Sequence, residues 1–340
     1  MTADSISLAV IGLGGWGQNV ARCLAGTSGS RLAAICDIDK KILAAQAGRY
    51  PGVKAVTDCE RILSDSEIDA VAIAAPTPLH AQIAEQALKE GKHVFVEKPM
   101  ALSVSDAEAL VRLSEEKRLT LMVGHLLEYH PAVGMLKNLI DEGELGEIFY
   151  IYCQRLNLGV VRRNENSFWS LAPHDISIVL YFFGAEPTDV SARGEYYLQD
   201  KVEDVVFVNL KFPDRRMAQI HVSWLDPHKE RRMVVVGSKK MAVFDDMQAG
   251  EKIRIYDKGA EVGRSTVDSI EAVSVRHGEI RIPLVPGGEP LAVEAQHFVD
   301  CVRTGKTPRS DGRDGLRVVR VLAAATESMA KNGTPVEIKR

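Results

Sequence analysis

Apolar and polar positions alternate along the first third of the chain in two different periods. Short apolar runs with strand character are separated by segments whose apolar residues recur at helical spacing. The predicted strands are 6–14, 31–39, 55–58, 68–76, 93–99 and 119–124, and the predicted helices are 15–26, 60–67, 78–91 and 103–118. Strands joined through helices of this length favour parallel pairing with right-handed crossovers. We therefore predict an N-terminal doubly wound parallel sheet of the Rossmann type.

After residue 125 the pattern changes to successive strands separated by turn signals, which is typical of an antiparallel sheet. The predicted strands are 147–158, 188–198, 202–212, 216–225, 231–238 and 240–247, and the predicted helices are 131–143, 174–184, 291–305 and 314–333, followed by a last strand at 335–338. The fold class is thus α/β, with a C-terminal α/β domain built on a large, open, mostly antiparallel sheet. We place the dinucleotide-binding domain at 1–124 and the substrate-binding and oligomerisation domain at 125–340.

The composition of the chain limits the classes of protein and of partner that it could represent. The 340 residues are 46% hydrophobic and 26% charged, which suits two globular domains. The 42 basic and 46 acidic residues leave a formal net charge of −4, so no nucleic-acid partner is predicted. Five scattered cysteines lack disulfide or metal-ligand spacing, so we predict no metal site and a reducing compartment. The first residues do not read as a signal peptide and no apolar run is long enough to span a membrane, so a cytoplasmic protein is expected.

The first predicted strand runs into a glycine motif, Gly12-Leu13-Gly14-Gly15-Trp16-Gly17, that opens a helix. In this pattern the first glycine permits a tight turn, the second lets the backbone approach a pyrophosphate, and the last allows close packing of helix on strand. The next strand ends in Asp37, twenty residues after Gly17, where a carboxylate accepts the ribose 2′-hydroxyl of NAD. No arginine follows to hold a 2′-phosphate, so NAD is favoured over NADP.

A second cofactor-binding segment follows the strand at 68–76. Prolines stop that strand, and the helix after Thr77 would aim its N–H groups at the same crevice. We predict cofactor contacts from Ala75, Pro76 and Thr77. For His80 two interpretations stay open, namely cofactor contact or an exposed residue at the start of a helix.

The segment His93-Val94-Phe95-Val96-Glu97-Lys98-Pro99 places a lysine at the carboxyl end of a buried strand, because proline ends ladder pairing. Ligands bind at that edge of open α/β sheets. Glu97 and Lys98 are therefore predicted to lie at the cofactor, and Lys98 at the substrate as well.

Several long segments resemble the family of glucose-fructose oxidoreductase, inositol dehydrogenase and MocA. The matching segments are 12–22, 75–102 with its Glu-Lys-Pro, 123–131, 173–184 and 297–308. The resemblance implies a Rossmann domain followed by an open-sheet domain that often makes oligomer contacts. It also implies that Lys98 and a histidine of the second domain face a sugar beside the nicotinamide.

Alcohol oxidation with NAD needs a group that takes the hydroxyl proton near working pH. Histidine titrates in that range, whereas lysine must have its pKa lowered. We therefore predict that Lys98 donates a hydrogen bond to the reacting oxygen and that His174 is the general acid/base. Which of the two finally accepts the proton is open. Relatives often carry an acid four residues before this histidine, where this chain has Ser170, and a helical neighbour such as Asp175 does not share a face with His174. The departure argues against a simple polyol dehydrogenase.

The substrate class rests on resemblance to the branch that oxidises UDP-N-acetylglucosamine, or its uronate, at C3 for 3-amino sugars of lipopolysaccharide. Arg155, Asn157 and Arg163 (or its neighbour Arg162) are candidate diphosphate ligands, because arginine binds diphosphate in bidentate fashion, and Trp169 is a candidate stacking residue. A free sugar or inositol dehydrogenase is the alternative. A non-catalytic NAD-binding regulator is the alternative of another class. A homodimer or homotetramer is expected, since an open sheet leaves one face to cover.

Overall fold

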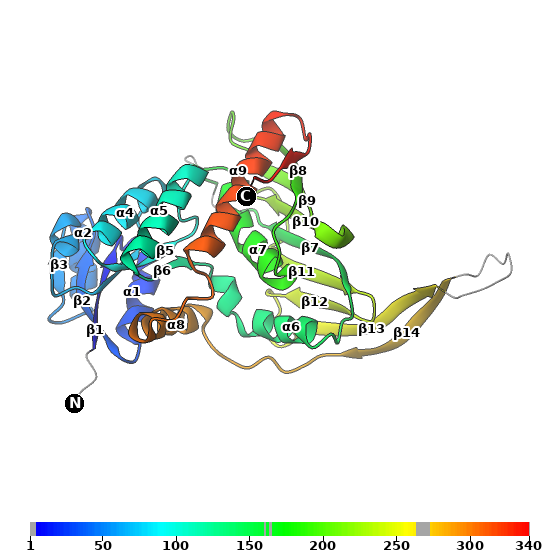
Figure 1. Cartoon of the computed structure of the whole chain (residues 1–340), viewed down its shortest axis with the longest axis horizontal. Helices are drawn as coiled ribbons and strands as arrows, with labels where there is room; N and C mark the ends of the chain where they lie inside the picture. Colours follow the sequence, from blue (N-terminus) through cyan, green and yellow to red (C-terminus); the bar gives the residue numbers. More distant parts are fainter. Residues whose placement is uncertain (1–4, 160, 163–164, 263–272, 340) are drawn as a thin grey trace. The chain divides into compact units, whose positions relative to one another are not determined.

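The computed structural model describes residues 5–159, 161–162, 165–262 and 273–339 (Figure 1). The chain divides into two compact units. The first consists of Met1–Tyr129 with Gly288–Ala323, and the second of His130–Gly287 with Ala324–Arg340.

The first unit is built on six parallel strands in the order β3-β2-β1-β4-β5-β6. The strands are β1 (Ile6–Ile11), β2 (Ser30–Cys36), β3 (Lys54–Val56), β4 (Ala70–Ile73), β5 (His93–Glu97) and β6 (Leu121–Gly124). The helices are α1 (Gly17–Ala25), α2 (Lys40–Ala47), α3 (Glu60–Leu63), α4 (His80–Lys89) and α5 (Val104–Lys117), with short 3-10 turns η1 (Thr77–Leu79) and η2 (Leu126–Tyr129). This order confirms the doubly wound sheet, and it reverses between β1 and β4, where such sheets open a crevice for a ligand.

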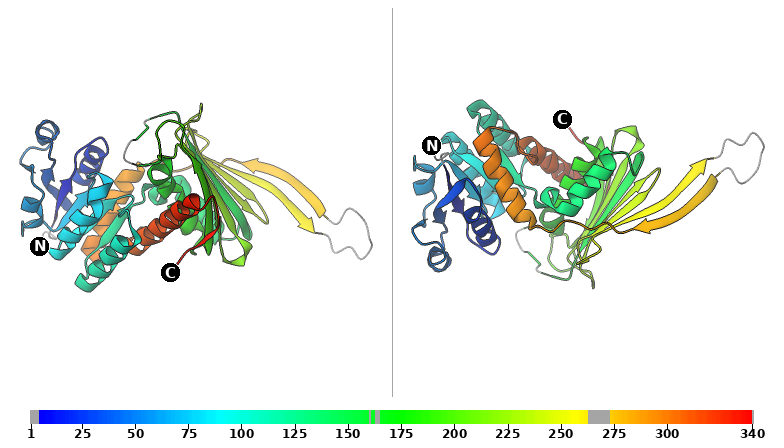
Figure 2. Two further views of the ribbon diagram at one scale, coloured as in Figure 1. Left: turned by 90° about the horizontal axis from the view of Figure 1, so that it is seen from above. Right: turned by 90° about the horizontal axis from the view of Figure 1, so that it is seen from below.

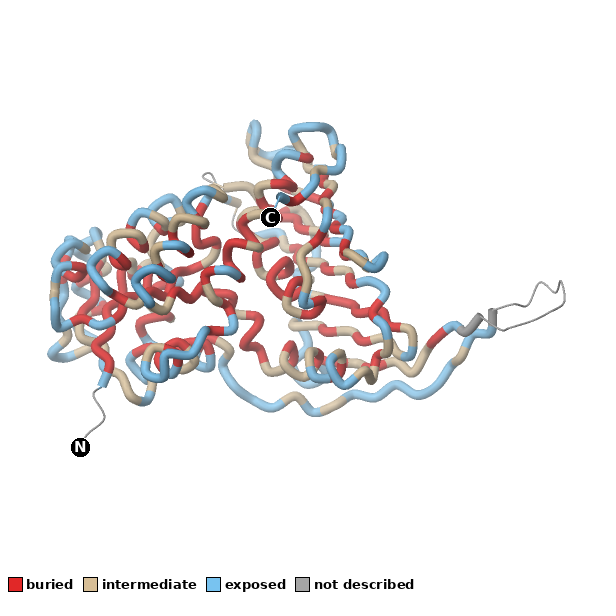
Figure 3. The backbone as a smooth tube through the Cα atoms, in the orientation of Figure 1, coloured by how far each residue is buried: buried red, intermediate tan, exposed pale blue. Residues whose placement is uncertain are grey.

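Both faces of this sheet are covered, which explains why its strands are continuous apolar runs. One core contains Ala9 and Ile11 of β1 with α4 and α5, and the other contains Leu8 and Val10 with α1 and α2. Figure 2 shows these helices on the two sides of the sheet, and Figure 3 shows the buried backbone running through the strands. Adjacent strand residues point to opposite faces, so a single strand supplies both cores.

The chain returns to the first unit near its C-terminus through α8 (Pro290–Thr304) and the first part of α9 (Gly312–Ala330). Phe298 of α8 is fully buried and its ring meets that of Phe95 on β5 edge-on, with the ring centroids 5.8 Å apart. The predicted first domain, residues 1–124, does not include this C-terminal segment. The amphipathic pattern of α8 shows that one face must be buried, but it does not tell which domain buries it.

The second unit holds a nine-stranded sheet in the order β14-β13-β12-β11-β7-β10-β9-β8-β15. Its strands are β7 (Ile148–Leu156), β8 (Asp189–Glu195), β9 (Val205–Lys211), β10 (Met217–Ser223), β11 (Glu230–Gly237), β12 (Met241–Asp245), β13 (Ile253–Val262), β14 (Val273–Arg281) and β15 (Val336–Glu337). The pairing is antiparallel throughout, except that β10 runs parallel to β7. The predicted open, mostly antiparallel sheet is therefore confirmed.

One face of this sheet packs against helices and the other is open. Helices α6 (Pro131–Asp141) and α7 (Ser167–Phe183) lie on the same face (Figure 2). The opposite face presents Tyr150, Phe207 and Met217, which are 44%, 46% and 52% exposed. Within the described residues, no helix has the length and apolar character that crossing a membrane requires.

Candidate active site

The two sides of the glycine turn after β1 differ in the space around the backbone. Gly12 has φ +91°, and a Cβ there would lie 2.6 Å from backbone atoms of Ala74 and Ala75. A Cβ on Gly17 would lie 2.0 Å from the Gly12 carbonyl oxygen. At Gly14, by contrast, a Cβ would meet nothing within 4 Å, and Gly15 is equally open. The turn is therefore closed toward the sheet and open on its outer side.

Asp37 holds this turn against the end of β2. Its Oδ2 accepts the Leu13 N–H at 2.7 Å, and its Oδ1 accepts the Asp39 N–H at 2.8 Å. Next to it, Ile38 is 89% exposed. A carboxylate and an exposed apolar side chain thus stand beside the open side of the glycine turn.

Trp16 connects the turn to β5. Its indole Nε1–H donates to Oε1 of buried Glu97 at 2.5 Å, and Glu97 Oε2 accepts the Lys98 N–H at 3.3 Å. Burial raises the pKa of Glu97, while the Trp16 hydrogen bond and the Lys98 charge oppose that rise. Lys98 itself is half-buried at the carboxyl end of β5.

His80 is buried at the start of α4, so its interpretation as an exposed residue is wrong. One ring nitrogen lies 2.8 Å from the carbonyl oxygen of Ala75 and the other 2.8 Å from that of Pro99. Burial lowers the pKa of His80, although these two carbonyls act in the opposite direction. The imidazole therefore joins the segment after β4, where Pro76 and Thr77 lie, to the residue that follows Lys98.

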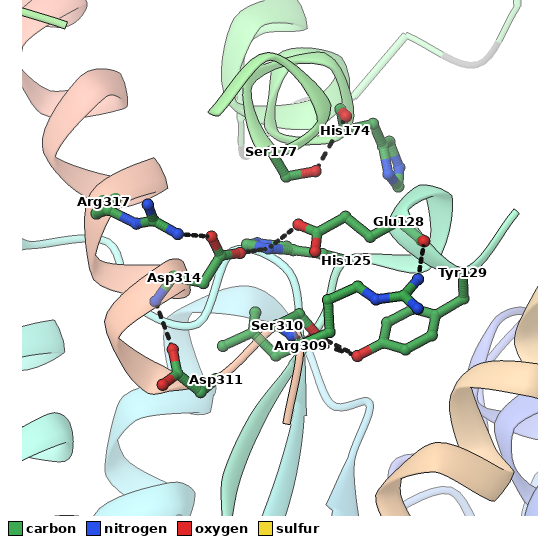
Figure 4. Close-up of polar contacts among 11 residues, drawn as sticks. His125, Glu128, Tyr129, His174, Ser177, Arg309, Ser310, Asp311, Asp314 and Arg317 are labelled. Carbon is green, nitrogen blue, oxygen red and sulfur yellow. Dashed lines mark hydrogen bonds and ion pairs between the residues drawn. The ribbon is translucent and has the colours of Figure 1, made fainter. Parts of the chain in front are cut away.

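In the second unit, helix α7 carries His174. The helix begins after Asn166, whose Oδ1 accepts the Trp169 N–H at 3.0 Å. His174 is half-buried, and its carbonyl oxygen accepts the Ser177 hydroxyl at 3.1 Å (Figure 4). Ser170, one turn earlier, is buried. Histidine at this position thus has an uncharged residue four positions before it, as the sequence indicated.

The candidate substrate ligands are in different environments. Arg155 is buried and binds Asp175 of α7 with two hydrogen bonds, Nε to Oδ2 at 2.7 Å and Nη2 to Oδ1 at 3.0 Å. Asn157 is half-buried just after β7. The Trp169 indole N–H donates to the hydroxyl of Thr326 at 3.0 Å. Arg163 lies outside the described residues. The sequence does not reveal the pairing of Arg155, because Asp175 lies twenty positions away on a helix whose packing against the sheet has no local signature.

Two sequence models of one enzyme family match successive parts of the chain. The first, described as an oxidoreductase family with an NAD-binding Rossmann fold, matches residues 6–125, and the second, the Gfo/Idh/MocA C-terminal domain, matches residues 133–243. The chain belongs to the Gfo/Idh/MocA oxidoreductase family. It is therefore an NAD-dependent dehydrogenase of CH–OH groups, and the predictions of enzyme class and cofactor are confirmed.

Individual relatives differ in their named substrates. The scyllo-inositol 2-dehydrogenase (NAD(+)) of Bacillus subtilis strain 168 is 29% identical over 98% of this chain and 96% of its own length. The UDP-N-acetylglucosamine 3-dehydrogenase of Acidithiobacillus ferrooxidans is also 29% identical, over 94% of each chain. In the structural comparison, a UDP-N-acetylglucosamine 3-dehydrogenase from A. ferrooxidans has a TM-score of 0.80 at 26% identity, covering 96% of this chain and 97% of that one. Substrate identity is therefore not fixed by overall similarity.

The first unit of this oxidoreductase fits NAD. The open side of Gly14 and Gly15 leaves room for a pyrophosphate beside the N-terminus of α1. Asp37 has the carboxylate that would accept a ribose hydroxyl, and exposed Ile38 would offer an apolar surface to a base. When bound, NAD supplies a hydride acceptor.

A buried ionic cluster of the oxidoreductase was missed from the sequence. At the end of β6, His125 Nδ1 lies 2.7 Å from Asp314 Oδ2 and 3.5 Å from Glu128 Oε1, and Asp314 also pairs with Arg317 (Figure 4). Although burial opposes it, the hydrogen bond to Asp314 and the nearby Glu128 carboxylate raise the pKa of His125 to about 9. Burial and the Asp314 charge raise the pKa of Glu128 to about 8. The segment 123–131 contributed to the resemblance, but its contact with residue 314 spans almost two hundred positions and has no local signature.

Proposed function

We propose that this oxidoreductase oxidises the C3 hydroxyl of a nucleotide-linked amino sugar, UDP-N-acetylglucosamine or its uronate. The observation that carries the catalytic part is the position of Lys98. It follows β5 directly, at the strand-end edge that also holds the Gly12 turn and Asp37. The likeness to UDP-N-acetylglucosamine 3-dehydrogenase across nearly the whole chain supports the choice of sugar.

In this proposal Lys98 donates a hydrogen bond to the reacting oxygen and His174 takes the hydroxyl proton. An ammonium group stabilises the negative charge that develops on oxygen as the proton leaves. The Glu97 side chain, which accepts the Lys98 N–H, and the His80 ring, which contacts the Pro99 carbonyl, hold the backbone on both sides of Lys98. Histidine as a residue type accepts protons near neutral pH.

The surroundings of His174 favour this sugar over a cyclitol. An acid four residues before the histidine would balance an imidazolium, but Ser170 carries no charge. The neighbouring carboxylate of Asp175 is bound by Arg155 at 2.7 and 3.0 Å. Position 170 therefore differs from the acid that many relatives are expected to carry four residues before this histidine.

A second candidate is oxidation of inositol or a free sugar. It is supported by the 29% identity to scyllo-inositol 2-dehydrogenase over 98% of this chain. The two candidates share Lys98 and His174, and they differ in whether a nucleotide is required. The presence of both residues counts against a non-catalytic regulator.

NADH formation measured by absorbance, with UDP-N-acetylglucosamine, its uronate, UDP-glucose and myo-inositol, tests this proposal. An assay with 2-oxoglutarate added covers an enzyme that keeps and recycles its cofactor. Turnover of the UDP-amino sugars alone supports the first candidate. Turnover of myo-inositol alone would replace it with the second.

We also propose that the open sheet face packs against a second copy of the chain. Tyr150 and Met217 are directly paired across β7 and β10, and both are about half exposed. Exposed aromatic and methionine side chains on a sheet face are typical of an isologous interface. Light scattering distinguishes a dimer or tetramer from a monomer.

A further inference from the structure

Two arginines lie next to each other on the central strands β7 and β11 of the second unit's sheet, near the C-terminal end of β7. Arg155 of β7 is directly paired with Arg231 of β11 in antiparallel register. Directly paired residues project from the same face of a sheet, about 4.5–5.5 Å apart at Cβ. That face is the one covered by α7, because Arg155 binds Asp175 of that helix.

The two arginines differ in their partners. The charge of Arg155 is neutralised, since its guanidinium binds both carboxylate oxygens of buried Asp175. Arg231 is exposed, and among the described residues its side chain makes no hydrogen bond or ion pair. One neutralised and one unneutralised arginine thus occupy adjacent strands.

Among the described residues, the neighbouring carboxylates form no direct ion pair with Arg231. Asp246 donates its backbone N–H to the Arg231 carbonyl oxygen at 2.9 Å, but its carboxylate lies 2.9 Å from Lys252 Nζ and 3.5 Å from His130 Nε2. Partial desolvation and then the charge of Arg155 lower the pKa of Arg231, which shows a net cost to its cationic form even though the charges of Asp246 and Asp175 act in the opposite direction. An anion placed there would relieve that cost.

We infer that Arg231 binds an anionic group of the substrate, a phosphate or a carboxylate, beside the Arg155–Asp175 pair. This inference rests on the proposed function and narrows it to acidic substrates. Asp175 directly follows His174 on α7. The ion pair between Arg155 and Asp175 therefore connects strand β7 to the helix that carries His174. A planar guanidinium with free N–H donors suits bidentate binding of phosphate or carboxylate oxygens. Arg155, which the sequence suggested as a diphosphate ligand, already binds the carboxylate of Asp175.

The chain offers a matched control in the next residue. Arg232 pairs with Gln154, and adjacent strand residues project to opposite faces, so Arg232 belongs to the open face. Arg231→Gln and Arg232→Gln therefore remove the same charge from the same strand on different sides. Arg231→Lys keeps the charge and loses the bidentate geometry.

Calorimetric titration of the NADH-loaded protein with UDP, D-glucuronate and N-acetylglucosamine tests the inference. Arg231→Gln should weaken binding of UDP, D-glucuronate or both by about tenfold to a hundredfold, the range for hydrogen bonds to charged groups. Arg231→Lys should recover part of the loss, Arg232→Gln should stay within about twofold of the wild type, and N-acetylglucosamine should bind all variants alike. A loss confined to UDP assigns a phosphate, and a loss confined to D-glucuronate assigns a carboxylate.

Equal affinities in Arg231→Gln and Arg232→Gln, or a wild type that binds neither anion, would overturn the inference. NADH titration of each variant shows whether the cofactor site is intact. Turnover of myo-inositol with no anion binding would reject both this inference and the UDP-sugar proposal. Turnover of a UDP sugar that is unaffected by Arg231→Gln would reject this inference alone.

Discussion

The indole Nε1–H of Trp16 and Oε1 of Glu97 form a 2.5 Å hydrogen bond between the glycine turn and the last residue of β5. Eighty-one residues separate these two side chains in sequence. Because Glu97 is buried and precedes Lys98, the bond fixes the glycine turn relative to the strand that carries the lysine. Cofactor binding and lysine placement should therefore respond together to its loss.

Trp16→Phe should weaken NADH binding by about tenfold, since a hydrogen bond to a charged acceptor contributes about 1.5–3 kcal/mol. Fluorescence titration with NADH measures the affinity. Glu97→Gln keeps one oxygen that can accept the indole proton but places an NH2 group where Oε2 accepts the Lys98 N–H, so its NADH affinity should lie between those of the wild type and Trp16→Phe. Tight NADH binding by Trp16→Phe together with weak binding by Glu97→Gln would contradict the role given to this hydrogen bond.

Alanine substitutions at two glycines of the same turn should have different effects. Gly12→Ala should lower the free energy of unfolding by about 1–3 kcal/mol, because of its positive φ and the 2.6 Å approach to Ala74 and Ala75. Gly14→Ala has open space around the new methyl group, so it should fold normally. That methyl group would occupy the space left for a pyrophosphate, and NADH affinity should fall. Chemical denaturation and NADH titration of both variants separate the two effects, and equal stabilities would contradict the assignment of Gly12.

Lys98→Met should lower kcat by about 10²–10⁴-fold, the range for loss of a proton-transfer or oxyanion-stabilising group. NADH should still bind, because the glycine turn and Asp37 are untouched. Steady-state kinetics on whichever sugar is turned over measure the effect. Lys89→Met is the matched control, since Lys89 is exposed on α4 and its ammonium group forms an ion pair with Glu85. A full-rate Lys98→Met enzyme would remove the proposed mechanism.

Buried Glu294 of α8 should make the first unit sensitive to alkaline pH. Neither carboxylate oxygen has a hydrogen-bond partner among the described residues, and burial, then the charges of Glu97 and Glu128, raise the pKa of Glu294 well above 4.5. A carboxyl group with a raised pKa binds its proton more tightly in the folded state, so stability falls as pH rises above the unfolded value. Glu294→Gln should therefore be more stable than the wild type near pH 8 and similar near pH 4.

Denaturation at both pH values tests this sign, with Glu289→Gln, at the N-cap of the same helix, as the comparison. Glu289 is exposed, and its hydrogen bond to Arg22 lowers its pKa, so its loss should bring no gain at alkaline pH. A Glu294→Gln variant without a stability gain near pH 8 would show that the carboxylate is compensated in the folded protein.

Local patterns were enough to predict which candidate site residues follow a buried strand. Gly12, Asp37 and Lys98 each follow a buried strand, and parallel strands bring their carboxyl ends to one edge. The pairing of Arg155 with Asp175 was not predictable, because it depends on how α7 packs on the sheet. The same holds for the burial of Glu294, since an acid on an amphipathic helix is normally assigned to the solvent side.

The return of α8 to the first unit has a consequence for the order in which the protein folds during translation. The sheet of that unit is complete once β6 (Leu121–Gly124) has been made, but Phe298, which covers Phe95, emerges from the ribosome about 170 residues later. Until then the apolar side chains on that face remain partly exposed. The first unit therefore starts to fold early in translation but can complete its core only after α8 has been made. During this interval we expect the nascent chain to depend on chaperones.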